Sequence, residues 1–142
     1  MMTPDRLAAE ITRRLDGPHA DQHTTAAAHL AAQSVRFLNY ATGPHSGAGL
    51  TFPATVYTIA GNLSAACYGL PQLCRQLSTW LHEQEAAGHL ANDDGTPPGI
   101  TVALAADRLR DAALLADKLG NDLAAVQSVI SGLNALPRGG AR

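Results

Sequence analysis

Residues 52–81 read FPATVYTIAGNLSAACYGLPQLCRQLSTWL and hold the most regular apolar pattern in the chain. Apolar side chains recur there at alternating spacings of three and four residues, which is the heptad pattern of an α-helix that packs against a neighbour. The heptad positions are Val56, Ile59, Leu63, Ala66, Leu70, Leu73, Leu77 and Trp80. The pattern predicts one long helix whose core seam consists of these side chains.

The outer side of the same stretch lacks charge. Between Phe37 and His82 the only formally charged side chain is Arg75. A solvated helix face normally carries Lys, Glu, Arg and Asp, whereas uncharged surfaces that contain tyrosine are typical of the centres of protein interfaces. We therefore predict a contact surface outside the core seam. Its expected residues are Tyr57, Thr58, Tyr68, Gln72, Arg75 and Thr79, and Ala60, Cys67 and Cys74 would allow close approach of a partner helix.

The composition predicts a single all-α domain over residues 1–142. A chain of 142 residues is long enough for one hydrophobic core and too short for two. Hydrophobic residues make up 46% of it and charged residues 15%, which is a globular composition. Aromatic residues reach only 4%, which favours closely packed helices over sheets.

Prolines, glycines and candidate caps divide the chain into three rods. The first rod is broken near Gly17-Pro18, and the candidate N-caps of the later rods are Thr51 and then Thr96 or Thr101. The expected helical segments are 3–16, 19–42, 52–90 and 97–136, followed by a frayed tail over 137–142. The last rod has its own heptads, which include Leu109, Ala116, Leu119, Leu123 and Val126. Three rods of similar length predict an elongated antiparallel helical bundle.

Pro71 leaves two architectures open, because a proline inside a helix kinks or ends it. The heptad passes through Pro71 without a phase slip, which favours one kinked helix, with Pro71 off the core seam. A hairpin at Gly69-Leu70-Pro71 would instead give a compact four- or five-helix bundle. The two cysteines distinguish the alternatives. Cys67 and Cys74 would lie about 10.5 Å apart in a continuous helix, too far for a disulfide, but could meet in a hairpin.

Two histidines are the weak candidate for a metal site. His19 and His23 are four residues apart, a spacing that places both on one helix face. No third ligand and no HExxH glutamate accompany them, so surface residues near a helix start are the favoured interpretation. We expect no metal and no cofactor.

Arg75 and His82 resemble the Arg-x(4–6)-His motif of HEPN-type helical ribonucleases, with the intervening residues QLSTWL. The resemblance implies that the pair would act on the RNA 2′-hydroxyl and phosphate, usually across a dimer interface. It covers two residues only, so Arg75 and His82 are the alternative catalytic pair, and the favoured expectation has no catalytic residues.

The stretches FPATVYTIAGNL (52–63) and LPQLCRQLSTWLHEQEAAGHL (70–90), with an Ala-rich final segment, resemble small uncharacterised helical proteins of high-GC actinobacteria. The resemblance spans residues 20–136 and implies a helical fold without a named activity. In those proteins an acidic residue is more usual at the position of His82.

The charge pattern disfavours nucleic acid and membrane as partners. The net charge is −2, and the arginines are interleaved with acidic residues, so no basic stripe forms. The uncharged run 52–70 contains too many polar residues for a membrane span. We expect a cytoplasmic protein.

These observations favour a non-enzymatic helical interaction or oligomerisation module that docks through the uncharged face of residues 52–81. Its partner would be a second copy of the chain or another helical protein. A HEPN-like ribonuclease or toxin is the first alternative, and a small-molecule-sensing helical bundle is the second.

Overall fold

The computed structural model describes residues 15, 17–44 and 49–136. This part of the chain forms three α-helices and contains no strand, which confirms the predicted all-α fold. The expected helix 3–16, apart from residue 15, and the expected tail 137–142 lie outside the described residues. The chain divides into two compact units, Met1–Gly49 and Leu50–Arg142, and each is described by itself. A single domain over residues 1–142 stays a prediction.

Helix α2 (Asp21–Ala41) belongs to the first unit. Residues 17–20 before it are not helical, in agreement with the break predicted at Gly17-Pro18. No residue of α2 is buried. Most of its large apolar side chains, including Phe37 and Tyr40, are exposed, and Leu38 is half-buried. The guanidinium of Arg36 lies 6.0 Å from the ring centre of Tyr40, within range of a cation–π contact.

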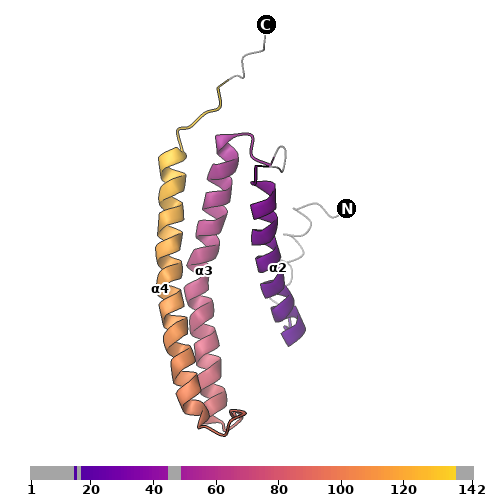
Figure 1. The fold of residues 1–142 in the computed structure, drawn as a ribbon, viewed down its shortest axis with the longest axis vertical. Coiled ribbons are helices and arrows are strands. Elements are labelled where there is room, and N and C mark those ends of the chain that lie inside the picture. Colours follow the sequence, from indigo (N-terminus) through magenta and orange to yellow (C-terminus); the bar gives the residue numbers. More distant parts are fainter. Residues whose placement is uncertain (1–14, 16, 45–48, 137–142) are drawn as a thin grey trace. The chain divides into compact units, whose positions relative to one another are not determined.

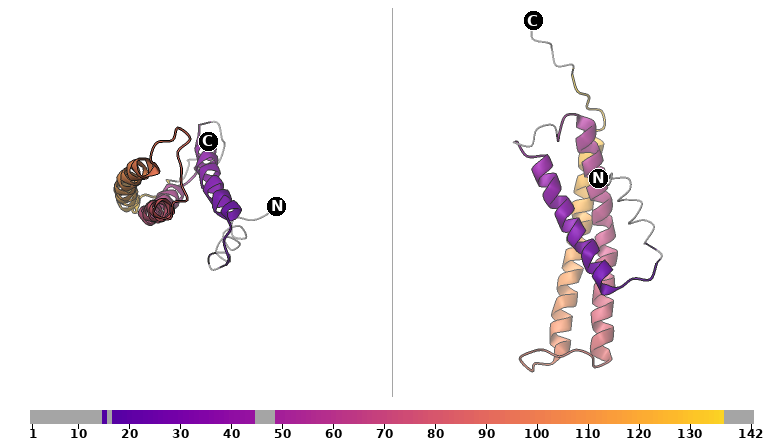
Figure 2. Two further views of the ribbon diagram at one scale, coloured as in Figure 1. Left: turned by 90° about the horizontal axis from the view of Figure 1, so that it is seen from below. Right: turned by 90° about the vertical axis from the view of Figure 1, so that its right-hand side faces the viewer.

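The second unit is a helical hairpin of α3 (Pro53–Ala86) and α4 (Pro98–Ile130). Figures 1 and 2 show the two helices side by side from three directions, joined by one loop. Each helix begins with a proline, whose fixed φ and missing N–H suit the first helical turn. The predicted threonine caps are wrong, because the N-cap positions are Phe52 and Pro97.

Both helices of the hairpin end earlier than predicted. Helix α3 stops at Ala86 because Gly88 takes a left-handed conformation with φ 73°, which ends a helix readily. Helix α4 stops at Ile130, six residues before the expected end at 136. The loop between α3 and α4 is held by Asn92, whose amide nitrogen donates to the hydroxyls of Thr96 and Thr101 at 2.9 Å each. Thr96 and Thr101 therefore fasten the loop where the sequence suggested caps.

Helix α3 continues through Pro71, so the hairpin expected there as the alternative does not occur. Cys67 and Cys74 lie on this one helix and are both free thiols. Pro71 itself is buried. The prediction that Pro71 lies off the core seam is wrong, because the seam runs along a different stripe of α3.

Small side chains form the contact between α3 and α4, which we call the small-residue seam. The buried residues of α3 are Ala60, Ser64, Cys67 and Pro71, and those of α4 are Val102, Ala116 and Gly120. Helix α3 continues the seam at the same spacing with half-buried Cys74, Ser78 and Leu81. Short side chains let the two backbones approach closely. The hydroxyl of Ser64 therefore reaches the carbonyl oxygen of Gly120, at 2.8 Å.

The predicted core seam of α3 is exposed in the hairpin. Leu70, Leu73 and Leu77 are 42%, 46% and 47% accessible, and Trp80 is 54% accessible. The heptad spacing identified an apolar stripe correctly, but α4 packs on the neighbouring stripe of small residues. We call the eight heptad positions from Val56 to Trp80 the leucine ridge; Ile59 and Leu63 within it are half-buried.

Candidate functional site

The leucine ridge lies about a quarter turn around α3 from the small-residue seam. Successive helical residues are about 100° apart, so each seam residue such as Cys67 or Cys74 is flanked by the ridge on one side and by Tyr68 or Arg75 on the other. The hairpin therefore has two different faces. One carries the leucine ridge, and the other carries Tyr68, Arg75 and His82.

Helix α4 extends the apolar face. Leu119 and Val126 are 52% and 44% accessible and each follows a seam position of α4 by three residues. The helices are antiparallel, as the contacts Ser64–Gly120 and Tyr57–Gln127 demonstrate. In an antiparallel pair, residues that follow a seam position by three residues lie on the same face of the hairpin in both helices, as Leu70 does after Cys67 and Leu119 after Ala116. Leu119 and Val126 therefore border the leucine ridge.

Charges are absent from the ridge, and most of the charges on α4 are paired within that helix. The only formally charged residue of α3 before His82 is Arg75, which lies on the opposite face. Helix α4 carries three exposed ion pairs within itself: Arg108–Asp111 at 3.7 Å, Arg110–Asp107 at 2.6 Å and Lys118–Asp122 at 2.8 Å. Exposed pairs of this kind contribute little to stability. The apolar face offers a partner hydrophobic area without a charge pattern to match.

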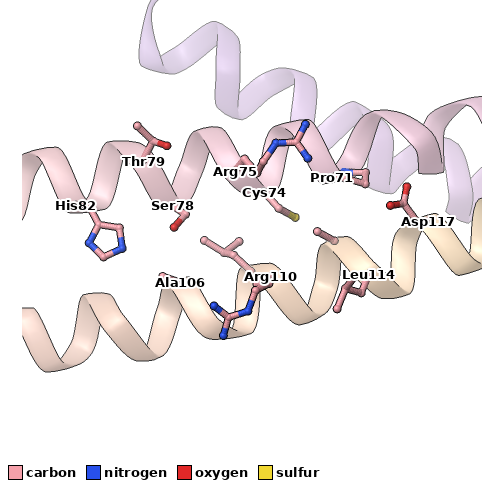
Figure 3. Close-up of a pocket in the computed structure, with 12 residues that line it drawn as sticks. Pro71, Cys74, Arg75, Ser78, Thr79, His82, Ala106, Arg110, Leu114 and Asp117 are labelled. Atoms are coloured by element: carbon pink, nitrogen blue, oxygen red, sulfur yellow. The ribbon is translucent and has the colours of Figure 1, made fainter.

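The opposite face is hollowed into a groove of about 530 Å³ between α3 and α4 (Figure 3). Its floor is apolar and includes Pro71, Cys74, Leu109 and Ala113, while its polar lining consists of Arg75, Ser78, Thr79, His82, Arg110 and Asp117. The volume falls in the range of about 300–1,000 Å³ that small-molecule sites occupy. Small-molecule sensing stays a prediction.

The interface residues predicted from the sequence mostly serve the hairpin or the groove. The hydroxyl of Tyr68 donates to the side-chain oxygen of Asn121 at 2.7 Å, and its ring lies against Gly120. The carbonyl of Tyr57 accepts a hydrogen bond of 3.4 Å from Gln127. Arg75 and Thr79 line the groove, and Thr58 and Gln72 are exposed. Their role in an interface stays a prediction.

Arg75 and His82 line the same groove, but their side chains do not converge. Figure 3 shows the ring of His82 directed toward α4 and the guanidinium of Arg75 directed away from it. No hydrogen bond or ion pair joins Arg75 or His82 to any other described side chain. A shared action on one phosphate would require Arg75 to turn inward.

The exposed apolar face is the feature that sequence reasoning missed. The sequence predicts the large heptad residues in the core of the monomer and the small stripe at a partner, whereas in the structure the small stripe packs on α4. A signal was present, because Ala60, Ser64, Cys67, Cys74 and Ser78 form a second stripe with the same spacing. Ala60, Cys67 and Cys74 indicate close helix approach in the sequence, but they do not identify α4 as the helix that approaches.

The described residues contain no cluster of three or more His, Cys, Asp or Glu side chains that could hold a metal ion. His19 precedes α2, and its ring nitrogen Nε2 lies 3.1 Å from the carbonyl oxygen of Leu15. His23 lies in the first turn of α2. His19 and His23 therefore have no third side-chain ligand among the described residues.

Comparison with protein-family models finds no match for this chain, and comparisons with curated proteins and with solved structures find none either. Among the described residues, no helix combines the length and the apolar character needed to cross a membrane. The resemblance to small actinobacterial helical proteins stays a prediction.

Proposed function

We propose that this chain is a non-enzymatic helical interaction module that docks a helical partner through the leucine ridge of residues 52–81. The observation that supports the proposal most directly is the exposure of Leu70, Leu73, Leu77 and Trp80 in one row along a continuous helix. Monomeric proteins rarely expose large contiguous apolar patches, and such patches mark interaction sites.

The gain from covering the ridge is large enough for a stable complex. Complete burial of one Leu or Trp side chain contributes on the order of 1.5–3 kcal/mol, and a partner would cover the exposed half of several of them. Trp80 is a suitable central anchor, since tryptophan is enriched among the residues that dominate binding energy.

The chemistry of the ridge indicates the kind of partner. Its spacing of three and four residues matches the packing of one α-helix along another. The absence of charge from the ridge means that a partner is selected by shape and hydrophobicity rather than by opposite charge. The fitting partner is therefore a helix with an uncharged apolar stripe.

Two neighbouring substitutions test this placement. Leu73 lies on the ridge, whereas Gln72 lies on the outer surface predicted from the sequence, and both are exposed. We expect Leu73→Glu to remove any complex larger than the 14.7 kDa chain, and Gln72→Glu to leave it intact. Crosslinking in the native cell followed by sizing measures this, and circular dichroism checks that both variants remain helical. Loss of the complex in Gln72→Glu but not in Leu73→Glu would move the interface to the outer surface.

A HEPN-like ribonuclease is the second candidate, because Arg75 and His82 line the same groove. This candidate needs a phosphate to bind in the groove and Arg75 to turn toward it. RNA cleavage by the purified chain that is lost in both Arg75→Ala and His82→Ala, and retained in Leu73→Glu, would favour it over the docking module. Cleavage that survives His82→Ala would exclude the pair.

A further inference from the structure

We infer that the partner on the leucine ridge is a second copy of this chain, and that the two α3 helices run antiparallel, centred between Ala66 and Leu70. The inference rests on the proposed function, since it names the partner of the same surface. It follows from the order of side-chain sizes along the ridge, from the neutrality of the ridge and from the area available.

The sizes of the ridge residues are complementary in one direction only. When α3 is laid against an antiparallel copy of itself, the ridge positions form four kinds of layer: Val56–Trp80, Ile59–Leu77, Leu63–Leu73 and Ala66–Leu70. The smallest residues meet large ones, and each layer pairs the first core position of one heptad with the second core position of the other. Two antiparallel helices pair unlike heptad positions in this way, whereas two parallel helices pair like positions.

The parallel arrangement fits the same side chains poorly. It would place Trp80 against Trp80 at one end, Val56 against Val56 at the other and Ala66 against Ala66 near the middle. Two tryptophans overfill a layer, while two alanines leave a gap, and both defects cost packing energy. The antiparallel arrangement avoids overfilling and gaps together.

Neutrality supports a like partner. A surface with strong charge of one sign repels its own copy, whereas the leucine ridge has no formal charge. Arg75, the one charged residue of α3 between Val56 and Trp80, lies on the opposite face, at the groove. A twofold axis between two hairpins would bring their two uncharged ridges together, the usual geometry of a homodimer. The product is a four-helix bundle made of two hairpins, in which Leu119 and Val126 of each α4 close the sides.

The area is sufficient for a stable dimer. The ridge extends over 25 residues from Val56 to Trp80, or about 36 Å at 1.5 Å per residue step. With both helices of the hairpin in contact, each about 10 Å wide, the covered surface is about 700 Å² per copy and about 1,400 Å² in total. Stable interfaces bury about 1,200–2,000 Å² in total.

The first experiment asks whether the partner is a second copy. Two versions of the full chain with different tags are co-expressed. The version with the first tag is purified, and the version with the second tag is then measured in the purified sample. We expect the second version to co-purify at about half the amount of the selected one, since random pairing also yields dimers of the selected version alone. We also expect a dimer by sedimentation velocity, and both results should be lost in Leu73→Glu and retained in Gln72→Glu. If a ridge-dependent complex forms in the cell but the pure chain is a strict monomer, this inference is overturned while the docking function stands. If no complex forms at all, both fail.

The second experiment measures direction. Spin labels are attached to cysteines introduced as Thr58→Cys or Gln72→Cys, in a chain with Cys67→Ala and Cys74→Ala. A centre between Ala66 and Leu70 separates the two copies of residue 58 by about 30 Å along the axis and the two copies of residue 72 by about 12 Å. Electron spin resonance should therefore give a clearly longer distance at 58 than at 72. Equal distances at both positions would show parallel helices and overturn the inference.

A third experiment needs no introduced cysteine and no spin label, and it covers the case in which the labelled chain does not fold. Ala66→Arg and Leu70→Glu are each expected to weaken the dimer. In a mixture, the antiparallel arrangement places Arg at 66 beside Glu at 70 of the other copy, so heterodimers should form at least tenfold more tightly than either homodimer. A parallel dimer leaves these positions one layer apart, about 6 Å along the axis, so the gain should be well below tenfold. An unimproved mixture counts against the antiparallel centre.

Discussion

The hydroxyl of Ser64 donates a hydrogen bond of 2.8 Å to the backbone carbonyl oxygen of Gly120, which joins α3 to α4 across 56 residues of sequence. Ser64 is 4% accessible, so its hydroxyl requires a protein partner. The bond exists because Gly120 has no side chain and lets α3 come close. Ser64 and Gly120 therefore fix both the spacing and the register of the hairpin.

Adding one methyl group at Gly120 should separate the helices. A Cβ atom there would lie 2.9 Å from ring carbon Cε1 of Tyr68 and 3.3 Å from Cβ of Cys67. We expect Gly120→Ala to lower the free energy of unfolding by about 1–3 kcal/mol, as overpacking in a core does. Gly69→Ala is the matched control, because its Cβ meets nothing within 4 Å. It should raise stability by up to about 1 kcal/mol through helix propensity. Urea unfolding measures both, and equal effects would contradict the close approach at Gly120.

Removing the Ser64 hydroxyl isolates the hydrogen bond from the packing. We expect Ser64→Ala to cost about 0.5–1.5 kcal/mol of unfolding free energy, the usual net contribution of such a bond. Thr58→Ala serves as the control, because the hydroxyl of Thr58 is exposed and donates within its own helix to the carbonyl of Ala54 at 3.0 Å. Thermal unfolding should separate the two variants clearly. A Ser64→Ala variant as stable as Thr58→Ala would show that the buried bond contributes nothing.

The two thiols should react at different rates. Cys67 is 7% accessible, whereas Cys74 is half-buried and lines the groove. In the folded protein we expect a thiol reagent to modify Cys74 first and Cys67 only after denaturation, as followed by mass spectrometry of the wild type and of Cys74→Ala. Oxidation should give no intramolecular disulfide, because both residues lie on one continuous helix. A rapid Cys67–Cys74 bridge would contradict a helix through Pro71.

Trp80 reports directly on whether the ridge becomes covered. It is the only tryptophan of the chain and is 54% accessible in the hairpin. If a second copy covers the ridge, its fluorescence maximum should shift to shorter wavelength as the protein concentration rises through the dissociation constant. Leu73→Glu should keep the long-wavelength emission at every concentration. A spectrum that does not depend on concentration in either chain, combined with a monomeric mass, would argue against self-association.

The loop carboxylate of Asp94 gives the expected pH dependence. The backbone N–H and the hydroxyl of Thr96 both donate to it, at 3.0 and 2.7 Å, and they lower the pKa of Asp94 below the usual value of 3.8. A carboxyl with a lowered pKa stabilises the folded state above its usual pKa and loses this contribution as the pH falls through the lowered value. Wild type should therefore exceed Asp94→Asn in melting temperature at pH 7, and the difference should shrink below pH 3.8. Because Asp94 is exposed, we expect a small effect, and a difference that grows in acid would have the wrong sign.

The helices were predictable from the sequence because their signals are local. The expected starts at 52 and 97 lie within one residue of the observed starts of α3 and α4, although the threonine caps proposed for them are wrong. The ends were less accurate, since the expectation for α3 extended past Gly88, where the backbone turns left-handed. Continuity through Pro71 followed from the unbroken heptad phase, which a turn had no reason to preserve.

The partner of each stripe was not predictable, because it depends on a choice between two surfaces of the same helix. Leu70 and Leu73 satisfy every sequence criterion for a core position, yet α4 packs on the stripe of Ser64 and Cys67. Large side chains give hydrophobic burial to any neighbour, whereas small ones favour only a neighbour that can come equally close. Gly120 in α4 supplies that neighbour, and only the three-dimensional register brings it opposite Ser64.

The two stripes of α3 place opposite limits on natural variation. The approach of the two backbones depends on small side chains at Ala60, Ser64 and Cys67. We therefore expect selection to keep side chains small at these positions while allowing them to be polar or apolar. The space beside Leu70, Leu73 and Leu77 is open in the hairpin. At these positions we expect selection to require hydrophobic side chains while allowing different shapes. The two stripes of one helix are therefore expected to be conserved for different reasons. Homologues that keep small residues at Ala60, Ser64 and Cys67 but lose hydrophobic ones at Leu70, Leu73 and Leu77 would keep the hairpin and no longer bind the partner.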